Sequence, residues 1–433
     1  MVSAVYLALA IASLLLPPAA RLGPWLPAHL ALAGAATTAI AAVLPFFSAA
    51  LVAGRPARPA IRVAGIALVA AGAVGVMAVY GLARGQAVTA ALAGGAFLAG
   101  LGLVAVAAFL PLRGALAPRY PLVQRAYAFA LANVTVGGTI ATLLIGGNPD
   151  VSGAWATLKP AHAWLNLIGF AGLVVVASLV HLAPTVAGTR IRPRRSSRIA
   201  IIGIAVGAPL VAAGYGTASD LLARAGALAV LGGAIGVAVH GWVVTLDGDR
   251  GRWTTDLGWH RLTASALAGG QVWLGLGLAV AAGRVLWLGA DPAAWSLTLL
   301  VGPLVIGGVV QILIGAMTHL LPAIGPGDPL RHMAQRKILG RLATVRIVGL
   351  NAGAALVTIG FGPAAGRWSS VGSGQDAAFD GSLVGLGLAA AAIALGASLA
   401  LLLIAARRPG TTAPALYGDR QPWSRQGGPG AGG

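Results

Sequence analysis

Long apolar runs recur from one end of this chain to the other, and each is nearly free of charged residues. A helix of about 20 apolar residues crosses the hydrocarbon core of a bilayer, where the backbone has to satisfy its own hydrogen bonds. The composition agrees, because 58% of the 433 residues are hydrophobic and only 9% are charged. We predict an all-α fold, a polytopic membrane bundle of about twelve transmembrane helices within residues 1–408. The predicted helices cover residues 3–17, 25–53, 61–83, 87–112, 123–147, 160–187, 198–216, 219–246, 259–287, 293–322, 340–360 and 381–406.

Basic residues fall on alternate connections between these runs. Of the 29 Lys and Arg residues, 23 lie after the even-numbered runs or in the C-terminal segment, and the other connections hold one each. By the positive-inside rule, this places both termini in the cytoplasm of a multi-pass protein of the inner (plasma) membrane. The net charge of +19 therefore indicates topology and contact with anionic lipid, not binding to nucleic acid. Residues 409–433, rich in Gly and Pro, are predicted to be a disordered cytoplasmic tail.

Several kinds of site are excluded by residue types that the chain lacks. It has no cysteine, so disulfides, iron–sulfur clusters and thiolate metal sites are absent. It has no glutamate either, and none of its ten aspartates lies in the middle of an apolar run. Ion- or proton-coupled transport usually places carboxylates at that depth, so this mechanism is disfavoured.

The sixth run carries a histidine near each end, His162 and His181. An ionisable side chain inside a membrane helix is costly and is a functional candidate for that reason. At about 1.5 Å per residue, the two lie roughly 28 Å apart, near opposite faces of the membrane. Asn166 follows His162 by one helical turn and shares its face. Residues 169–184 are echoed by residues 307–322, with His319 in the place of His181.

The remaining histidines fall into layers once the orientation is assigned. His29 and His162 lie near the outer ends of the second and sixth runs, whereas His181, His240 and His319 lie near inner ends. Facing histidines in a helical bundle hold haem or a transition metal, although a histidine at a helix end often only faces interfacial water or caps a carbonyl. Asn133, Thr135, Gln271, Gln311 and Asn351 mark faces that turn inward, either toward a ligand or as interhelical hydrogen-bond partners. His260 and His332 lie in basic loops and are expected at the surface.

These features resemble the catalytic subunit I of heme-copper oxidases, with twelve helices, cytoplasmic termini and outer histidines at the starts of the second and sixth helices. HAWLNLIGFAGLVVVASLVHLAP (162–184) is similar to the sixth helix of the C-type oxidases and of the related NnrS-type haem and copper proteins. The resemblance implies haem b and/or copper as cofactors, with His29 as a haem ligand and His162 as a copper ligand. HLALAGAATTAIAAVLPFF, GQVWLG and LLPAIGPGDP also resemble actinobacterial membrane segments sometimes fused ahead of a multicopper oxidase domain.

The chain departs from the oxidase pattern at two helices. Members of that family carry a His-His pair in helix 7 and a His-x-His in helix 10, whereas residues 198–216 have no histidine and the tenth run has only His319. The first hypothesis is therefore a redox membrane protein that lacks the full set of oxidase histidines. Such a protein is an oxidoreductase component, and its expected partner is a periplasmic copper or cytochrome protein. The alternatives are a transporter or channel for a small solute, or a membrane scaffold for a periplasmic copper enzyme.

Overall fold

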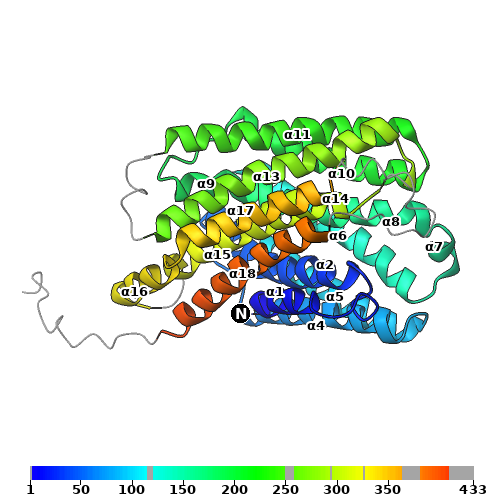
Figure 1. The fold of residues 1–433 in the computed structure, drawn as a ribbon, viewed down its shortest axis with the longest axis horizontal. Coiled ribbons are helices and arrows are strands. Elements are labelled where there is room, and N and C mark those ends of the chain that lie inside the picture. The colour runs from blue at the N-terminus through cyan, green and yellow to red at the C-terminus, as the bar shows by residue number, and fades with distance from the viewer. Residues whose placement is uncertain are drawn as a thin grey trace, which may run out of the picture.

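The computed structural model describes residues 2–114, 120–248, 258–292, 295–324, 327–362 and 381–408, and these ranges contain helices and no strand. The predicted tail, 409–433, lies outside the described residues. Figure 1 shows the helices stacked side by side along one common direction. The elements are α1 (Val2–Ser13), α2 (Trp25–His29), η1 (Leu30–Ala36), α3 (Thr37–Val52), α4 (Pro59–Leu82), α5 (Ala87–Phe109), η2 (Leu110–Gly114), α6 (Pro121–Ile145), α7 (Pro149–Gly153), α8 (Trp155–Ala163), η3 (Trp164–Gly172), α9 (Leu173–Val186), α10 (Arg195–Gly216), α11 (Asp220–Asp247), α13 (Trp259–Leu288), α14 (Thr298–Leu300), η5 (Val301–Val310), α15 (Gln311–Ile324), α16 (Pro329–Leu339), α17 (Ala343–Gly360) and α18 (Gly381–Ala406).

Within the described ranges, eleven helices are long and apolar enough to cross a membrane, so the fold is a polytopic helical bundle. The first of the twelve predicted spans, over residues 3–17, has to be corrected. Helix α1 has 12 residues, about 18 Å, and ends at Ser13, ahead of two consecutive prolines at Pro17 and Pro18. Ser3 donates a hydrogen bond to the carbonyl of Ala35, so α1 starts beside the middle of the first long span, and the N label in Figure 1 lies partway along the bundle.

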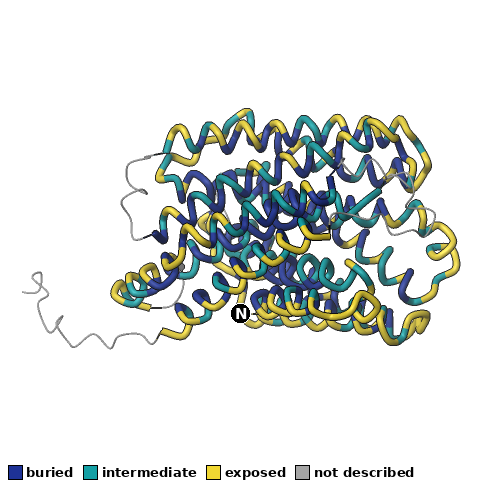
Figure 2. Tube along the Cα trace, in the orientation of Figure 1, coloured by how far each residue is buried: buried dark blue, intermediate teal, exposed yellow. Residues whose placement is uncertain are grey.

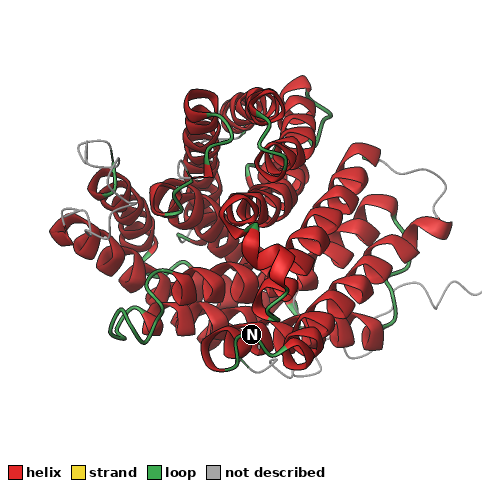
Figure 3. Cartoon of the chain, turned by 90° about the vertical axis from the view of Figure 1, so that its right-hand side faces the viewer, coloured by secondary structure: helices red, strands yellow, loops and turns green. Residues whose placement is uncertain are grey.

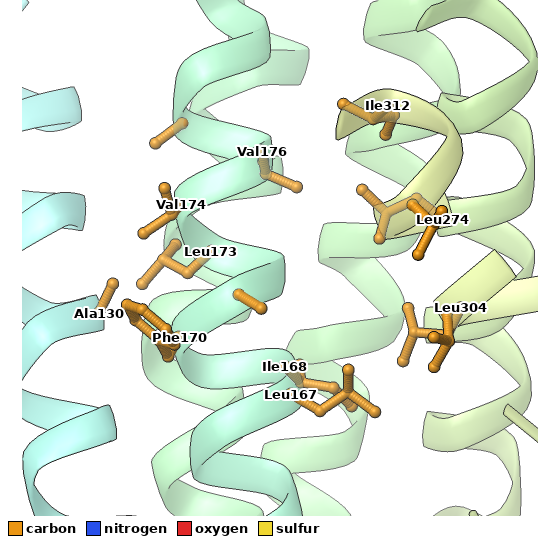
Figure 4. Packing of buried hydrophobic residues seen from close by; sticks show 14 of the residues in the cluster. Ala130, Leu167, Ile168, Phe170, Leu173, Val174, Val176, Leu274, Leu304 and Ile312 are labelled. Carbon is orange, nitrogen blue, oxygen red and sulfur yellow. The ribbon is translucent and has the colours of Figure 1, made fainter. Parts of the chain in front are cut away.

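Two spans form the centre of the bundle, the sixth run (α8–η3–α9) and the tenth (α14–η5–α15). In each, 78% of the most apolar window is buried, against 33–56% in the other spans. Figure 2 shows the buried residues inside and exposed ones along the outer helices, where exposed aliphatic side chains suit contact with lipid. In Figure 4, Phe170 points toward Ala130 of α6, while Leu167 points toward Leu304 of η5.

The internal repeat seen in the sequence is also present in the structure. Both central spans contain a π-helical segment, η3 and η5, followed by an α-helix that carries a histidine and then a proline. Segment η3 ends nine residues before His181, and η5 ends nine residues before His319. A third π-helical segment, η1, lies in the first long span. Because π-helices are rare and often mark functional sites, the spans that carry them are the first candidates to hold one.

Helices α10 and α11 show why glycine is abundant in this bundle. Gly207 on α10 faces Gly226 on α11, and a Cβ atom at Gly207 would lie only 2.6 Å from the carbonyl oxygen of Gly226. Lipid offers no hydrophobic driving force between helices, so close backbone packing at small residues holds such pairs together.

The two ends of the bundle differ in charge. One end carries helix α16 and the segment between α9 and α10, which holds Arg190, Arg192 and Arg194, and we call it the basic end. The other end carries α7, and we call it the opposite end. Figure 1 shows α16 and α7 at opposite extremes of the molecule, and Figure 3 looks along the helices from the α7 side.

Candidate functional site

The two outer histidines sit directly beside π-helical segments at the opposite end. His29 is the last residue of α2 and is followed at once by η1, while His162 lies two residues before η3. Segments η1 and η3 pack against each other, which brings the two spans together below the histidines. The wider π turns also expose backbone carbonyls to neighbours, and Asn133 of α6 donates to the carbonyl of Gly169 within η3 (2.9 Å).

His29 is held by its own helix. Its Nδ1 lies 2.8 Å from the carbonyl oxygen of Trp25, one turn earlier, so Nδ1–H donates and Nε2 keeps its lone pair. The ring stacks on Trp25 at 4.2 Å between centroids, and Trp25 in turn stacks on Tyr80 of α4 at 4.0 Å. The Arg84 guanidinium lies 5.1 Å above the ring of Tyr80. His29 thus belongs to an aromatic column that fixes the orientation of its imidazole.

His162 is held by a different helix. Its Nδ1 lies 2.9 Å from the carbonyl oxygen of Gly137 on α6, so this histidine also donates through Nδ1 and leaves Nε2 as a free base. The lack of a side chain at Gly137 leaves room for Asn166, since a Cβ atom there would lie 2.4 Å from the side-chain nitrogen of Asn166. The ring of Trp155 lies 6.2 Å from the imidazole on the side of the bundle end.

Asn166, one turn after His162 on the same face, contacts the imidazole but does not accept a hydrogen bond from it. Its Nδ2 lies 3.0 Å from Nδ1 and 3.5 Å from Nε2 of the imidazole, distances that place the amide over the ring face and not in the ring plane. The Nδ1–H is directed to Gly137, and the Asn166 amide instead donates to the His162 backbone carbonyl (2.8 Å). Asn166 therefore packs on the imidazole and limits its rotation.

His29 and His162 lie on two spans that pack against each other through η1 and η3. Both are tied through Nδ1 to a backbone carbonyl, which is how metal-ligating histidines are commonly oriented. Among the described residues, no group of three or more His, Cys, Asp or Glu side chains could hold a metal ion. Neither of the two best-formed cavities of the described chain touches the pair.

Gly137→Ala provides a test of this geometry. The added methyl group would collide with the Asn166 amide, which has to move and takes the face of the His162 ring with it. Loss of such supporting contacts typically lowers metal affinity about 10–100-fold, and we expect a loss of that size in copper affinity measured by competition titration. Gly138→Ala is the neighbouring control, because the nearest side-chain atoms to a Cβ there belong to Leu98 (3.2 Å) and Phe97 (3.8 Å), not to Asn166. Equal affinities for the two variants would contradict the role of Gly137.

The structure separates the inner histidines and buries two of them without hydrogen bonds. His181 on α9 packs edge-on against Phe47 of α3, with 4.6 Å between ring centroids. His240 on α11 approaches the carbonyl of Leu179, but neither of its ring nitrogens, nor those of His181, makes a hydrogen bond of proper geometry within the described chain. His319 on α15 stacks instead on Trp259 of α13 at 5.2 Å. The three therefore have three different environments.

The surroundings of His319 are basic and aromatic. Trp259 donates through Nε1 to the carbonyl of Thr318 (2.8 Å), and the Arg336 guanidinium lies 4.9 Å from the Trp259 ring. His319, Arg336 and His260 all border the ring of Trp259. His260, expected at the surface, is partly buried against Trp259. This cluster joins α13, α15 and α16 at the basic end.

Of the polar residues predicted to face inward, three are buried, namely Asn133, Gln271 and Gln311. Asn351 is half-buried and accepts a hydrogen bond from Trp273 (2.8 Å), so it joins α13 to α17. Thr135 is exposed and donates to the carbonyl of Leu131 in its own helix, which corrects the prediction that it faces the interior. A threonine satisfies its hydroxyl in this way even on a lipid-facing surface.

Three residues of the candidate site were not singled out from the sequence. Trp25 stands four residues before His29, and this spacing is a signal that helical periodicity offers. Tyr80 and Gly137 come from other helices, α4 and α6, and no local pattern connects them with a histidine. Comparison of the chain with models of known protein families and with curated proteins gives no significant match.

Proposed function

We propose that this chain is a copper-binding redox membrane protein in which His29 and His162 bind one copper ion near the opposite end of the bundle. The observation that carries the proposal is the shared geometry of the two imidazoles. Each donates through Nδ1 to a backbone carbonyl, each keeps its Nε2 lone pair, and the two spans that carry them pack together through η1 and η3. Both also adjoin π-helical segments, which often accompany functional sites.

Copper suits this donor set better than other metals. Neutral imidazoles bind Cu, Zn, Ni and Fe, and the affinity of nitrogen ligands for divalent metals is highest for Cu²⁺. Hard ions such as Mg²⁺ and Ca²⁺ need carboxylates. Among the described residues, no carboxylates form a group of three or more ligands with the histidine pair. When bound, copper supplies one-electron chemistry, and the chain lacks the thiolates that iron–sulfur centres would need for the same task.

The remaining residues of the site hold the imidazoles in place. Trp25 and Tyr80 fix the His29 ring by stacking, and Gly137 and Asn166 fix the His162 ring through one hydrogen bond and one face contact. Trp164, fully buried at the start of η3, excludes water from the helices below. A periplasmic copper or cytochrome protein would exchange electrons with the site from this end of the bundle.

The proposal is tested on the full chain purified in detergent. After exposure to copper and removal of excess ion, we expect about one copper per chain, with nitrogen hyperfine structure from two imidazoles in the electron paramagnetic resonance spectrum of the Cu²⁺ form. Growth with ample haem provides the comparison, since bound haem gives a Soret band. A Soret band in protein that contains no copper would show that the bound cofactor is haem and not a copper ion. The absence of both signals would refute the redox function and favour a transporter or a scaffold.

The predicted orientation has its own test. Because basic residues gather at one end, we expect a reporter fused after Arg408 to be active in the cytoplasm. The matched fusion within α7, at Ser152, should then report the periplasm. The reverse pattern would place the histidine pair on the cytoplasmic side and exclude a periplasmic partner.

A further inference from the structure

Two cavities lie in the half of the bundle near the basic end, and both are bordered by Gln271 of α13. The first, about 10 Å³, is enclosed by α9, α10 and α11, with His240 and Ser197 as its other polar residues. The second, about 20 Å³, has Thr245 as its other polar residue and Leu267 among its apolar ones. A cavity of roughly 10–15 Å³ holds one water molecule if two or more polar groups line it. Both cavities meet these conditions.

Polar groups at the first cavity lack partners within the described chain. His240 is only 4% exposed, and neither of its ring nitrogens is hydrogen-bonded. Gln271 is 3% exposed; its Nε2 donates to the carbonyl of Leu267 (3.1 Å), whereas its Oε1 accepts from nothing. Buried polar groups are nearly always paired with protein or with ordered water. Two unpaired groups at one cavity therefore point to a ligand that donates and accepts hydrogen bonds.

The hydrogen-bond requirements match water. Ser197 donates its hydroxyl proton to the carbonyl of Arg194 (2.8 Å), and Thr245 donates to that of Gly241 (2.8 Å), so both oxygens keep lone pairs for a further donor. A water in the first cavity can donate to Gln271 and Ser197 and accept from an N–H of His240. A water in the second cavity can donate to Thr245 and to Gln271. Water donates and accepts as these groups require.

The positions of Gln271 and Thr245 show at which depth of the bundle the two cavities lie. It lies 12 residues after Trp259, where α13 begins at the basic end, which places it about 18 Å deep and near the middle of a 30 Å hydrocarbon layer. Thr245 lies close to the basic end of α11. Arg194 pairs with Asp247 across the ends of α10 and α11. The second cavity thus lies on the side of the basic end, and both cavities border Gln271 at mid-depth.

We propose that the two cavities hold ordered water molecules and form a hydrated inlet from the basic end to Gln271 at mid-depth. The inlet is independent of copper binding, because none of its residues belongs to the histidine pair at the opposite end. Its ligand is water that exchanges with the bulk solvent, and Thr245 lines the part nearest the surface.

Radiolytic hydroxyl labelling of the full chain tests both the water and its exchange. A pulse of X-rays converts ordered water to hydroxyl radicals that modify adjacent side chains, so Leu179 and Leu267, which line the cavities, should be labelled several-fold more than Leu44 and Leu278. The two controls are equally buried and line neither cavity. Mixing with H₂¹⁸O for seconds before the pulse should put ¹⁸O into the products. Labelling no higher than in the controls, or products that keep ¹⁶O, would overturn the inlet.

Substitutions sharpen the result. Gln271→Met keeps the length of the side chain but removes the shared polar group, and labelling at both leucines should fall to the level of the controls. Gln124→Met is the matched control, since Gln124 is buried but already paired with Ser48 (2.9 Å). Thr245→Val keeps the side-chain volume, so the fold is retained, and it should slow ¹⁸O incorporation at Leu267. Wild-type labelling and exchange in both Gln271→Met and Thr245→Val would refute the proposal.

Discussion

Copper affinity is expected to fall by more than about 100-fold when His162 is replaced by alanine, and by a similar factor for His29→Ala. Removing only the hydrogen-bond partner of a ligand typically costs 10–100-fold, so removing one of two ligands has to cost more. The two imidazoles come from α2 and α8, and each keeps a free Nε2. Competition titration of the purified full chain with a copper chelator of known affinity measures the effect.

The matched control is His332→Ala in helix α16, at the basic end and away from the pair. Its copper affinity should equal that of the wild type. A loss in His332→Ala as large as in His162→Ala would mean that copper binds nonspecifically to surface histidines. If only one of the two outer histidines mattered, the ion would have a single imidazole ligand and the proposed site would be wrong. Circular dichroism of each variant verifies that the helices remain intact.

Replacing Arg346 with alanine is expected to destabilise the protein by about 3–5 kcal/mol, the largest effect we predict on folding. Arg346 on α17 is fully buried and has no carboxylate partner in the described chain. Its guanidinium donates to the carbonyl of Leu339 at the end of α16 (2.7 Å) and to the hydroxyl of Ser398 on α18 (2.9 Å). The Leu339 carbonyl, left unpaired, costs about 1–3 kcal/mol, the Ser398 hydroxyl keeps only its bond to the Ala394 carbonyl, and the empty volume adds to the cost.

Arg341→Ala is the control for this prediction, because Arg341 lies five residues earlier, in the connection between α16 and α17, and is exposed. Its free energy of unfolding should stay within about 0.5 kcal/mol of the wild type, as for most surface substitutions. Unfolding of both variants in mixed detergent micelles, followed by circular dichroism, gives the comparison. Equal stabilities would show that the Leu339 carbonyl and Ser398 find water or other donors once Arg346 is gone.

The same contacts explain how the basic end is assembled. Helix α16 lies against the end of α18, where Arg331 donates to the carbonyl of Ala406 (3.2 Å) and Gln335 to that of Ala405 (3.2 Å). The last carbonyls of a helix have no partner within it and carry partial negative charge, so basic side chains are favoured there. Basic residues that the sequence assigns to topology therefore also hold helix ends together.

Much of the fold follows from the sequence alone, because a membrane span needs only a long apolar run that forms a helix. Eleven of the twelve predicted spans correspond to helices of sufficient length. The failure at residues 3–17 has a simple cause. Hydropathy extends to Leu16, but the helix ends at Ser13, and Pro17 and Pro18 prevent its continuation. The repeat that relates His181 to His319 was likewise visible in the sequence, although not its π-helical segments.

The sequence also determined which residue types are available to bind a metal, since neither cysteine nor glutamate is present and no aspartate lies in the middle of an apolar run, which leaves histidine there. Only the tertiary structure decided which of them meet. His29 and His162 are far apart in the chain and lie on neighbouring spans because η1 packs on η3, while the His162 ring donates to Gly137 on a different helix, α6. Periodicity reports neighbours one turn apart on the same helix, whereas contacts between helices depend on how each helix is rotated and tilted in the bundle. That packing also left His181 and His240 buried without hydrogen bonds, which no property of their own helices foretells.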